Sequence, residues 1–438
     1  MLARPLSRAA YLFLLSGGVI PSALAGGGYF ALGYGPHARQ MAGATTALVG
    51  DAFAGSSNPA KWLAAGNRVD IGTEFFMPYR RVERTGSGTV YDFGTTSDKD
   101  IFLIPEAAIS RRISDRLAWG LTFYGNGGLN TEYPGTTGVP GTNVVPALCG
   151  NAPANFLLGC GKLGVDIIQM ILAPGFAYRV APKHTLGIAP LITLQRFEAY
   201  GLQAFTAFSK LPNDVTNRGS DYALGAGVRV GWLGEITPSL TLGASYASRV
   251  FMDKFAHYEG LLADGNLDIP ENFSLGLAWR PHPPLMVTFD YQRIHFGDVP
   301  ATGNGGLNTL LDPVNKPLGS AEGSGFNWRN QQNFRFGAAY AMTSALTVRA
   351  GYAYGERPPR DNDINTVTLN MLAPSAEHQV SAGFTWQPDP GNEFHLAYSQ
   401  FIPRDFAGAS TTALLGVGGV ERISPHVHTL MVAWTWKP

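Results

Sequence analysis

Apolar side chains alternate with small or polar ones along many segments of this chain, and the last segment shows the alternation most clearly. Within residues 426–436, alternate positions hold two different sets, Leu430, Val432, Trp434 and Trp436 in one and Thr429, Met431, Ala433 and Thr435 in the other. A repeat of two places these sets on opposite faces of a β-strand. The pattern recurs about fourteen times, which is typical of a sheet that exposes an apolar face to lipid and a polar face to a lumen.

The predicted strands come in pairs that are joined by short turns, and longer segments separate the pairs. Short turns are expected at 114–115, 181–184, 237–239, 281–284, 342–344 and 388–391. Segments such as 299–327 and 357–376 are much longer. Bacterial outer-membrane barrels show this asymmetry, with short turns on the periplasmic side and long loops outside. We therefore predict an all-β fold, a transmembrane antiparallel β-barrel of about fourteen strands that spans residues 67–438.

A large soluble β-sandwich or propeller is the alternative fold. It would hide the aromatic strand faces in a core, but it gives no reason for the regular exchange of short turns and long loops. The composition also favours the membrane, because only 15% of the residues are charged, against roughly 25% in soluble domains. After the N-terminus no run of about 20 apolar residues occurs, so no membrane-spanning helix is predicted.

Residues 1–25 have the features of a secretory signal peptide. Arg4 and Arg8 supply a positive start, residues 9–20 form an apolar core, and Ala23-Leu24-Ala25 fits a cleavage site ahead of Gly26. An exported barrel predicts the outer membrane of a Gram-negative bacterium as the location.

Residues 26–66 do not alternate, and we predict that they form an N-terminal plug, or hatch, in the barrel lumen. Glycine and aromatic residues dominate 26–35, residues 39–44 are small and mildly helical, and Asn58-Pro59-Ala60 fits a turn or a helix start. Some outer-membrane barrels are closed by such an internal segment.

The charges and cysteines restrict the partners. Lys+Arg 32 balance Asp+Glu 32, and no basic stripe with interleaved aromatic residues is present, so no nucleic-acid partner is expected. Cys149 and Cys160 lie in one segment rich in Gly, Pro and Asn, and export through an oxidising compartment favours a disulfide between them. A free or metal-binding pair is the alternative, although no histidine lies nearby. No cofactor and no metal site are predicted.

Three stretches of the sequence resemble the FadL family of outer-membrane channels. Residues 34–44 (YGPHARQMAGA), followed by Asn58-Pro59-Ala60, resemble the N-terminal plug of the family, and residues 127–133 (GGLNTEY) and 267–273 (LDIPENF) resemble two segments that flank its strands. The family comprises channels for long-chain fatty acids and, in a TodX-like branch, for aromatic hydrocarbons. Barrels of this type usually end on an aromatic residue, whereas this chain adds Lys437-Pro438, which bears on its recognition by the assembly machinery.

The resemblance implies a lateral exit through a gap in the wall at a kinked third strand. The segment that would carry the kink is Gly125-Asn126-Gly127-Gly128, where glycines weaken strand pairing and permit a bulge or a break. Alternatively, the strand simply ends there and runs into a long loop, residues 125–164. In the family the plug motif packs close to the gap, so Asn58, Pro59 and Ala60 are expected to act as the gate.

Candidate ligand contacts come from the plug and from two apolar loop stretches. Tyr29 and Phe30 match aromatic residues that point into the ligand pocket of relatives. The loop stretches suit the capture of a hydrophobic ligand and contain Phe156, Leu157, Leu158, Phe205 and Phe208. Ordinary packing of plug and loops is the alternative. By alternation Arg229, Arg335, Arg349 and Asp290 face the lumen, where they would brace the barrel or meet a substrate carboxylate.

The sequence thus predicts a non-enzymatic outer-membrane channel for passive uptake of hydrophobic molecules, either long-chain fatty acids or aromatic and aliphatic hydrocarbons. Extracellular loops would capture the molecule, a lumen pocket would hold it, and it would leave laterally at the third strand. Expected partners are the substrate, outer-membrane lipid and lipopolysaccharide, and the barrel-assembly machinery, with the protein itself a monomer. A lipase-like enzyme and a general porin are the alternatives. The enzyme needs catalytic side chains that we do not identify, and the porin would lack a plug.

Overall fold

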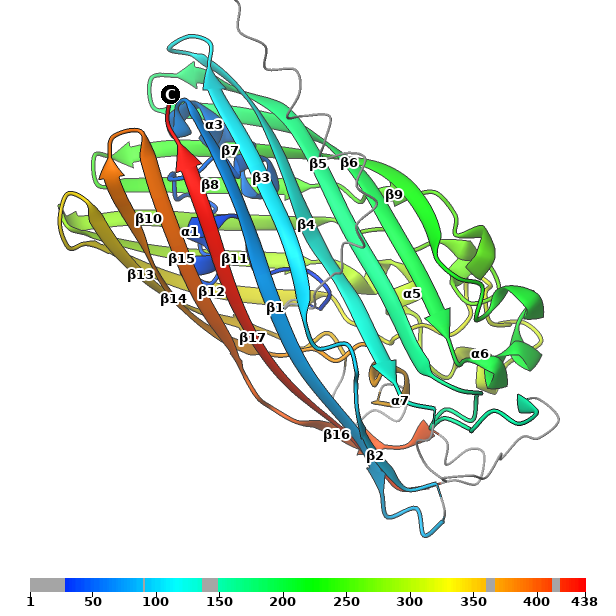
Figure 1. Ribbon diagram of the computed structural model, residues 1–438. Helices are drawn as coiled ribbons and strands as arrows, with labels where there is room; N and C mark the ends of the chain where they lie inside the picture. Colours follow the sequence, from blue (N-terminus) through cyan, green and yellow to red (C-terminus); the bar gives the residue numbers. More distant parts are fainter. Residues whose placement is uncertain (1–27, 90, 136–148, 360–366, 412–417) are drawn as a thin grey trace, which may run out of the picture.

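The computed structural model describes residues 28–89, 91–135, 149–359, 367–411 and 418–438. The predicted signal peptide, residues 1–25, lies outside these ranges. Within them the chain forms one closed antiparallel barrel of fourteen long strands, as predicted (Figure 1).

The wall of the barrel is built from strands of eight or more residues, each paired with the next long strand along the chain. The last strand pairs with the first from Val69↔Trp436 to Thr85↔Val420, which closes the barrel. The long strands are β1 (Arg68–Thr85), β3 (Phe102–Arg112), β4 (Leu117–Tyr133), β5 (Leu163–Ala181), β6 (His184–Tyr200), β7 (Asp221–Thr237), β8 (Leu240–Ala247), β10 (Asn272–His282), β11 (Leu285–Ile294), β12 (Gln331–Ala341), β13 (Leu346–Gly355), β14 (His378–Asp389), β15 (Asn392–Ile402) and β17 (Val420–Trp436). Three short strands add to the extracellular rim, β2 (Phe93–Thr96), β9 (Phe251–Met252) and β16 (Phe406–Ala409).

The outer face of the wall is apolar, and the alternation in β17 shows why. Its alternate residues from Thr429 to Thr435 are buried toward the lumen, whereas the intervening residues from Leu430 to Trp436 point outward. Aromatic side chains are exposed on the outer face near the short turns, where they suit the membrane–water interface: Tyr178, Trp279, Tyr340, Trp386, Phe394, Trp434 and Trp436. Among the described residues, no helix is long and apolar enough to cross a membrane.

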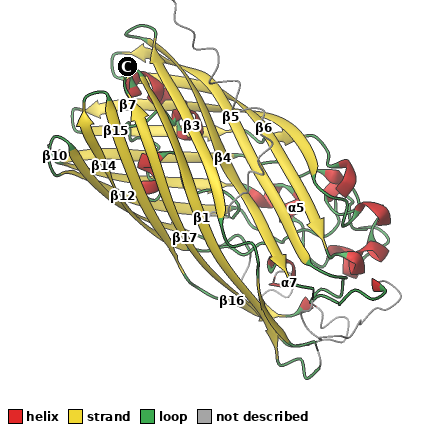
Figure 2. Ribbon diagram, in the orientation of Figure 1, coloured by secondary structure: helices red, strands yellow, loops and turns green. Residues whose placement is uncertain are grey.

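The two ends of the barrel differ. The short turns lie at the end that holds the C-terminus, and the long connections with their helices lie at the other (Figure 2). These connections contain η2 (Gln203–Phe208), η3 (Pro212–Asp214), η4 (Ala256–Tyr258), η5 (Ala263–Gly265), η6 (Phe296–Asp298), α5 (Pro300–Gly303), α6 (Asn308–Leu311) and α7 (Val367–Asn370). Short turns mark the periplasmic side, so the helical end is extracellular.

The N-terminal segment lies inside the barrel as a plug, toward the periplasmic end, where Figure 1 shows it in dark blue. Its helices are α1 (Pro36–Gln40), α2 (Ala54–Ser57), η1 (Pro59–Lys61) and α3 (Trp62–Ala65). Helix α1 contacts β13, β14, β15 and β17, whereas η1 contacts β5, β6 and β7 on another part of the wall. The plug therefore crosses the lumen from one side to the other.

Candidate functional site: a lateral opening and an apolar cavity

The third barrel strand, β4, is only half paired with its neighbour β3. Their ladder runs from Arg112↔Ala118 to Ala107↔Phe123 and ends there. Strand β4 continues to Tyr133 and stays paired with β5, with a β-bulge between Gly125 and Gly127. The described residues of β3 and β4 thus form no ladder on the extracellular side of Phe123. We call this stretch of the wall the lateral opening.

The outer face of the wall beside this stretch is apolar. Leu103 in β3 pairs with Phe75 in β1, and Leu172 in β5 pairs with Phe123, so these residues lie at its level. Phe75, Leu103 and Leu172 are exposed on the outer face of the barrel. On the inner side, a Cβ at Gly125 would lie 2.8 Å from the Ile104 Cγ2, so the Ile104 side chain reaches across the opening to β4.

The glycine run does not end the strand, contrary to the alternative of a loop over residues 125–164. The run forms a bulge, and the strand resumes beyond it to Tyr133. Glycine is required at one position for a steric reason. A Cβ at Gly127 would lie 1.7 Å from the Tyr29 carbonyl oxygen, so only glycine lets the plug approach the strand so closely.

The start of the plug pairs with the free edge of β4. Phe30 and Gly127 form an antiparallel bridge. The Ala31 N–H donates to the Asn126 carbonyl oxygen at 3.0 Å, and the Gly128 N–H donates to the Tyr29 carbonyl oxygen at 3.1 Å. Residues 29–31 therefore occupy part of the edge that β3 leaves unpaired.

Aromatic packing holds this plug segment from the extracellular side. The Tyr29 ring centroid lies 5.1 Å from that of Phe296 and 6.0 Å from that of Trp328, and Phe30 lies 5.5 Å from Phe296. Phe296 belongs to η6 and Trp328 precedes β12, so loops between β11 and β12 support the segment. Burial raises the pKa of the Tyr29 hydroxyl, which therefore stays uncharged.

Asn126 and Tyr34 fix the bulge from the lumen. Asn126 donates from Nδ2 to the Gln169 Oε1 at 2.8 Å. The Tyr34 hydroxyl donates to the Asn126 carbonyl oxygen at 2.9 Å, and its ring lies 4.5 Å from that of Tyr124. The polar contacts of the bulge thus point inward, away from lipid.

An apolar cavity of about 170 Å³ lies beside the opening, between strands β4 to β6 and the extracellular loops. The strands contribute Leu129, Val165, Ile167 and Phe197, and the loops contribute Leu202, Leu262, Leu267, Ala301, Thr302, Leu307 and Leu318. Its few polar side chains are Thr, Ser and Tyr29, which are uncharged, so the cavity suits an uncharged ligand.

The structure brings five of the seven predicted ligand residues to this cavity: Tyr29, Leu157, Leu158, Phe205 and Phe208. Phe30 instead lines a smaller polar cavity near the plug. Phe156 instead stacks on Phe93, with their ring centroids 4.6 Å apart. The ligand-binding role of the five residues stays a prediction.

Cys149 and Cys160 form a disulfide, with a Cα–Cα distance of 5.2 Å. The loop that it closes carries Leu157 and Leu158, which line the cavity. The Asn155 side chain adds order to this loop, because its Oδ1 accepts from the Leu157 and Gly159 N–H groups at 3.0 Å each. The disulfide therefore closes a loop that forms part of the cavity wall.

A model of the outer membrane protein transport family (OMPP1/FadL/TodX) matches residues 161–419, more than half of the chain. The chain belongs to this family. Its members are transport proteins, which agrees with the prediction of a non-enzymatic role. Family and barrel together place the protein in the outer membrane of a Gram-negative bacterium, as predicted.

Solved outer-membrane transporters have a similar fold. The toluene transporter TodX of Pseudomonas putida superposes with a TM-score of 0.67 at 17% identity, covering 93% of this chain and 99% of TodX. A Pseudomonas aeruginosa FadL homologue gives 0.64 at 16% identity, with 94% and 99% covered. The Ralstonia pickettii toluene transporter TbuX gives 0.62 at 16% identity, with 93% and 98% covered. A comparison with the curated proteins found no match.

Buried polar bonds fasten the plug of this FadL-family barrel to the wall. Arg39 Nη2 lies 2.8 Å from the Glu74 Oε2 and 3.1 Å from the Glu106 Oε1. The Thr46 N–H donates to the Asp290 carboxylate at 2.7 Å. These contacts attach the plug to β1, β3 and β11 of the wall.

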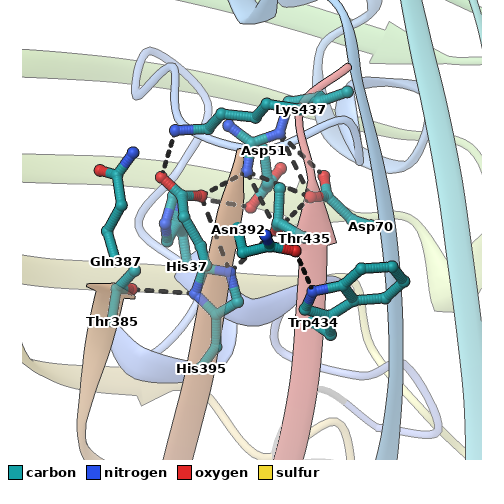
Figure 3. Close-up of polar contacts among 12 residues, drawn as sticks. His37, Asp51, Asp70, Thr385, Gln387, Asn392, His395, Trp434, Thr435 and Lys437 are labelled. Carbon is teal, nitrogen blue, oxygen red and sulfur yellow. Dashed lines mark hydrogen bonds and ion pairs between the residues drawn. The ribbon is translucent and has the colours of Figure 1, made fainter. Parts of the chain in front are cut away.

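A polar cluster at the periplasmic end ties the plug to the last strands (Figure 3). In the plug, His37 Nδ1 lies 3.5 Å from the Asp51 Oδ2, and the Ala52 N–H donates to Asp70 at 2.5 Å. In the wall, Arg68 Nη2 lies 2.9 Å from the Glu393 Oε2. The cluster extends to Lys437, which pairs with Glu393. Burial, followed by the nearby charge of Arg349, holds the pKa of His37 well below its usual range.

The plug motif Asn58-Pro59-Ala60 is hydrogen-bonded both to the barrel wall and within the plug. Asn58 donates from Nδ2 to the Trp232 carbonyl oxygen at 2.8 Å and to the Thr46 carbonyl oxygen at 3.0 Å. Its Oδ1 accepts from the Ala60 N–H at 3.1 Å, so Asn58 caps η1. The motif therefore packs on β5, β6 and β7, and its role as a gate stays a prediction. Residues 29–31 are the part of the plug that pairs with β4 at the bulge.

The lumen arginines contact the plug. Arg229 donates to the Gly55 carbonyl oxygen at 2.8 Å, and Arg349 donates to the Gln40 Oε1 at 2.9 Å. Arg335 approaches the Gly43 carbonyl oxygen at 3.5 Å. With the described residues, none of the three forms an ion pair. Arg229 and Arg335 both line the small polar cavity beside Phe30.

Sequence reasoning missed the residues that complete the cavity from distant segments. Leu129, Ile167 and Phe197 alternate inward on their strands like any lumen residue, and nothing in their pattern marks a cavity. Phe296 and Trp328 carried a weak signal, because large aromatic residues are unusual in exposed loops.

Proposed function

We propose that this protein is a passive channel for small uncharged hydrocarbons in the outer membrane. Extracellular loops capture the molecule, the apolar cavity holds it, and it leaves through the lateral opening into outer-membrane lipid when residues 29–31 move. One observation carries the proposal: the apolar cavity adjoins the stretch of wall that lacks strand pairing.

The two possible exit routes differ in the contacts that a passing molecule must break. Along the axis, the plug is held by buried ion pairs such as Arg39–Glu74, and breaking one costs about 3–5 kcal/mol. At the lateral opening, residues 29–31 are held by two backbone hydrogen bonds of about 0.5–1.5 kcal/mol each and by the aromatic contacts of Tyr29 and Phe30. Movement of this segment separates no buried ion pair, which favours the lateral route.

Capture is supported by apolar side chains on the extracellular surface. Leu211, Leu311 and Val314 are exposed there, and Val314 is 85% exposed. Phe205 and Phe208 lie in η2 between this surface and the cavity. A hydrophobic molecule can thus move from the surface to the cavity over apolar contacts.

The size of the cavity supports small aromatic hydrocarbons. A protein cavity of about 150 Å³ lined by Leu, Ile and Phe stays dry and binds benzene. The cavity here is of similar lining and of about 170 Å³. The toluene transporters TodX and TbuX have the same fold, which agrees with this choice.

A long-chain fatty acid is the second candidate, because of the lumen arginines. Arg229 and Arg335 are buried at the polar cavity next to Phe30 and lack a carboxylate partner among the described residues. A guanidinium binds a carboxylate bidentately, so a fatty acid head group would suit this place.

Equilibrium binding to purified protein in detergent separates the two substrates. We expect toluene to bind, and Ile167→Trp to abolish binding because the indole fills the cavity. Ile188→Trp is the matched control, since Ile188 points outward on β6. Palmitate binding that falls with Arg229→Gln and Arg335→Gln would instead favour the fatty acid. Retention of neither compound would count against the proposed transport function.

A further inference from the structure

A histidine and two carboxylates converge at the extracellular rim, where the sequence predicted no metal site. Glu271 immediately precedes β10, His295 immediately follows β11, and Asp298 ends η6. The His295 Nδ1 lies 3.2 Å from the Glu271 Oε1 and 3.1 Å from the Asp298 Oδ2. Among the described residues, these three alone form such a group, with all their ligand atoms within 4.8 Å of one another.

The spacing fits a common centre. Zn²⁺ binds imidazole nitrogen and carboxylate oxygen at about 2.0–2.2 Å, so in a tetrahedral site two such ligand atoms lie roughly 3.3–3.5 Å apart. The two distances to His295 Nδ1 are only slightly shorter. His295 Nδ1 and the Asp298 Oδ2 are also within hydrogen-bond distance, but a metal ion between the three groups would offset the charge of both carboxylates, which one Nδ1–H proton does not.

Neighbouring groups hold the three ligands in place. The Tyr246 hydroxyl donates to the Glu271 Oε2 at 2.8 Å, which leaves Oε1 turned toward His295. The His295 N–H donates to the Glu271 carbonyl oxygen at 3.1 Å, and the Asp298 N–H donates to the His295 carbonyl oxygen at 3.2 Å. The His295 Nε2 is turned into the protein without a hydrogen-bond partner, so Nδ1 is the nitrogen presented. Such outer contacts orient metal ligands.

We propose that Glu271, His295 and Asp298 bind a divalent first-row transition metal such as Zn²⁺, with water in the remaining position. The site is open to the outside, because the Glu271 and Asp298 side chains are 37% and 49% exposed. One imidazole nitrogen with carboxylate oxygens suits Zn²⁺ and its neighbours better than Ca²⁺ or Mg²⁺, which prefer oxygen alone.

The position of the site gives the ion a structural effect. It joins the start of β10 to the segment 295–302. Within that segment Phe296 packs on Tyr29 and Phe30, and Ala301 and Thr302 line the cavity. A bound ion would therefore stiffen one segment that supports both the plug start and the cavity wall.

Metal content and affinity test the proposal on full-length protein that carries no histidine tag. We expect one Zn²⁺ per chain after dialysis, a rise in melting temperature with Zn²⁺ and a Co²⁺ absorption spectrum of a nitrogen–oxygen site. Glu271→Gln, Asp298→Asn and His295→Ala should each weaken Zn²⁺ binding at least tenfold. The paired control His257→Ala with Asp253→Asn removes an exposed histidine and an exposed acid elsewhere and should leave binding unchanged.

Several results would overturn the assignment. Wild-type protein without stoichiometric Zn²⁺ would exclude the site, and equal binding by the Asp298→Asn variant would place the ion elsewhere. Ca²⁺ that displaces Zn²⁺ at equal concentration would contradict a transition-metal site. Variants that keep the heat-dependent gel shift of a folded barrel remain valid for the comparison. None of these measurements depends on transport, so failure here leaves the proposed channel function standing.

Discussion

The guanidinium of Arg39 in the plug lies 2.8 Å from the carboxylate of Glu74 in the barrel wall, and both side chains are buried. The same guanidinium reaches Glu106, which also accepts a hydrogen bond from the Gly35 N–H at 2.8 Å. Glu106 lies in the part of β3 that has no ladder with β4. Arg39 therefore anchors the plug and also holds the free stretch of β3 at the lateral opening.

Arg39→Met should loosen the plug. The substitution leaves two carboxylates buried without their partner, which costs about 3–5 kcal/mol. We expect a lower melting temperature and a higher ion conductance in planar bilayers. The triple variant with Glu74→Gln and Glu106→Gln removes the stranded charges and should recover most of the stability. Conductance equal to that of the wild type would show that Arg39 does not secure the plug.

A reversible lock tests the lateral opening. A Cβ at Gly125 in β4 would lie 2.8 Å from the Ile104 Cγ2 in β3, so cysteines at these two positions are placed to form a disulfide across the opening. Oxidised Ile104→Cys/Gly125→Cys protein should block hydrocarbon uptake, and reduction should restore it. The single variants and the wild type, treated with the same reductant, control for the native disulfide. Uptake that is unaffected by oxidation would contradict an exit at this place.

Removal of the native disulfide should weaken binding without unfolding the barrel. A disulfide that closes a short loop stabilises it by roughly 3 kcal/mol, chiefly by restricting the unfolded chain. The Cys149→Ser/Cys160→Ser variant should therefore lose about tenfold in toluene affinity, because Leu157 and Leu158 no longer have a fixed position. The barrel should stay folded at a somewhat lower melting temperature, since the loop lies beyond the ends of β4 and β5 and leaves their pairing intact. Unchanged affinity would mean that the loop keeps its conformation without the disulfide.

The plug should be less stable in acid because of His37. Its pKa lies well below the usual range, owing to burial and then to Arg349, His395, Arg68 and Lys61, with Asp51 as the facing carboxylate. The unfolded chain takes up a proton near pH 6.5, which the folded chain does not. This contribution to stability is therefore complete above about pH 6.5 and is lost as the pH falls below it.

Replacement of this histidine isolates its effect. His37→Asn should show a smaller loss of melting temperature than the wild type between about pH 7.5 and 5.5. The exposed His257→Asn is the control and should behave like the wild type. Equal acid sensitivity of His37→Asn and wild type would assign the pH dependence to other groups.

The barrel could be predicted from sequence because the alternation of apolar and polar residues is a local pattern. The alternation in 426–436 needs no knowledge of distant residues, and the same holds for turns such as 181–184. The plug was recognisable for the opposite reason, since residues 26–66 break the alternation.

The candidate site depends on contacts between distant segments, which the sequence does not display. The glycines at 125–128 are equally compatible with the end of a strand and with a bulge, and the choice is made by Tyr29, about 100 positions earlier in the chain. Likewise Asn58 gives no sign of the strand it touches, and it binds the Trp232 carbonyl. Apolar loop residues such as Leu157 and Phe205 were identifiable because exposed loops seldom contain them.

The unpaired edge of β4 has a consequence for the membrane itself. If residues 29–31 withdraw as we propose, the Asn126 C=O and the Gly128 N–H lose their backbone partners, and in apolar surroundings each unpaired group costs several kcal/mol. The bilayer thus favours the return of residues 29–31 to the edge of β4 after each molecule has passed. In a detergent micelle, where water reaches the wall, the free-energy cost of unpaired backbone groups is smaller. The lateral opening should therefore stay open for longer there than in a bilayer.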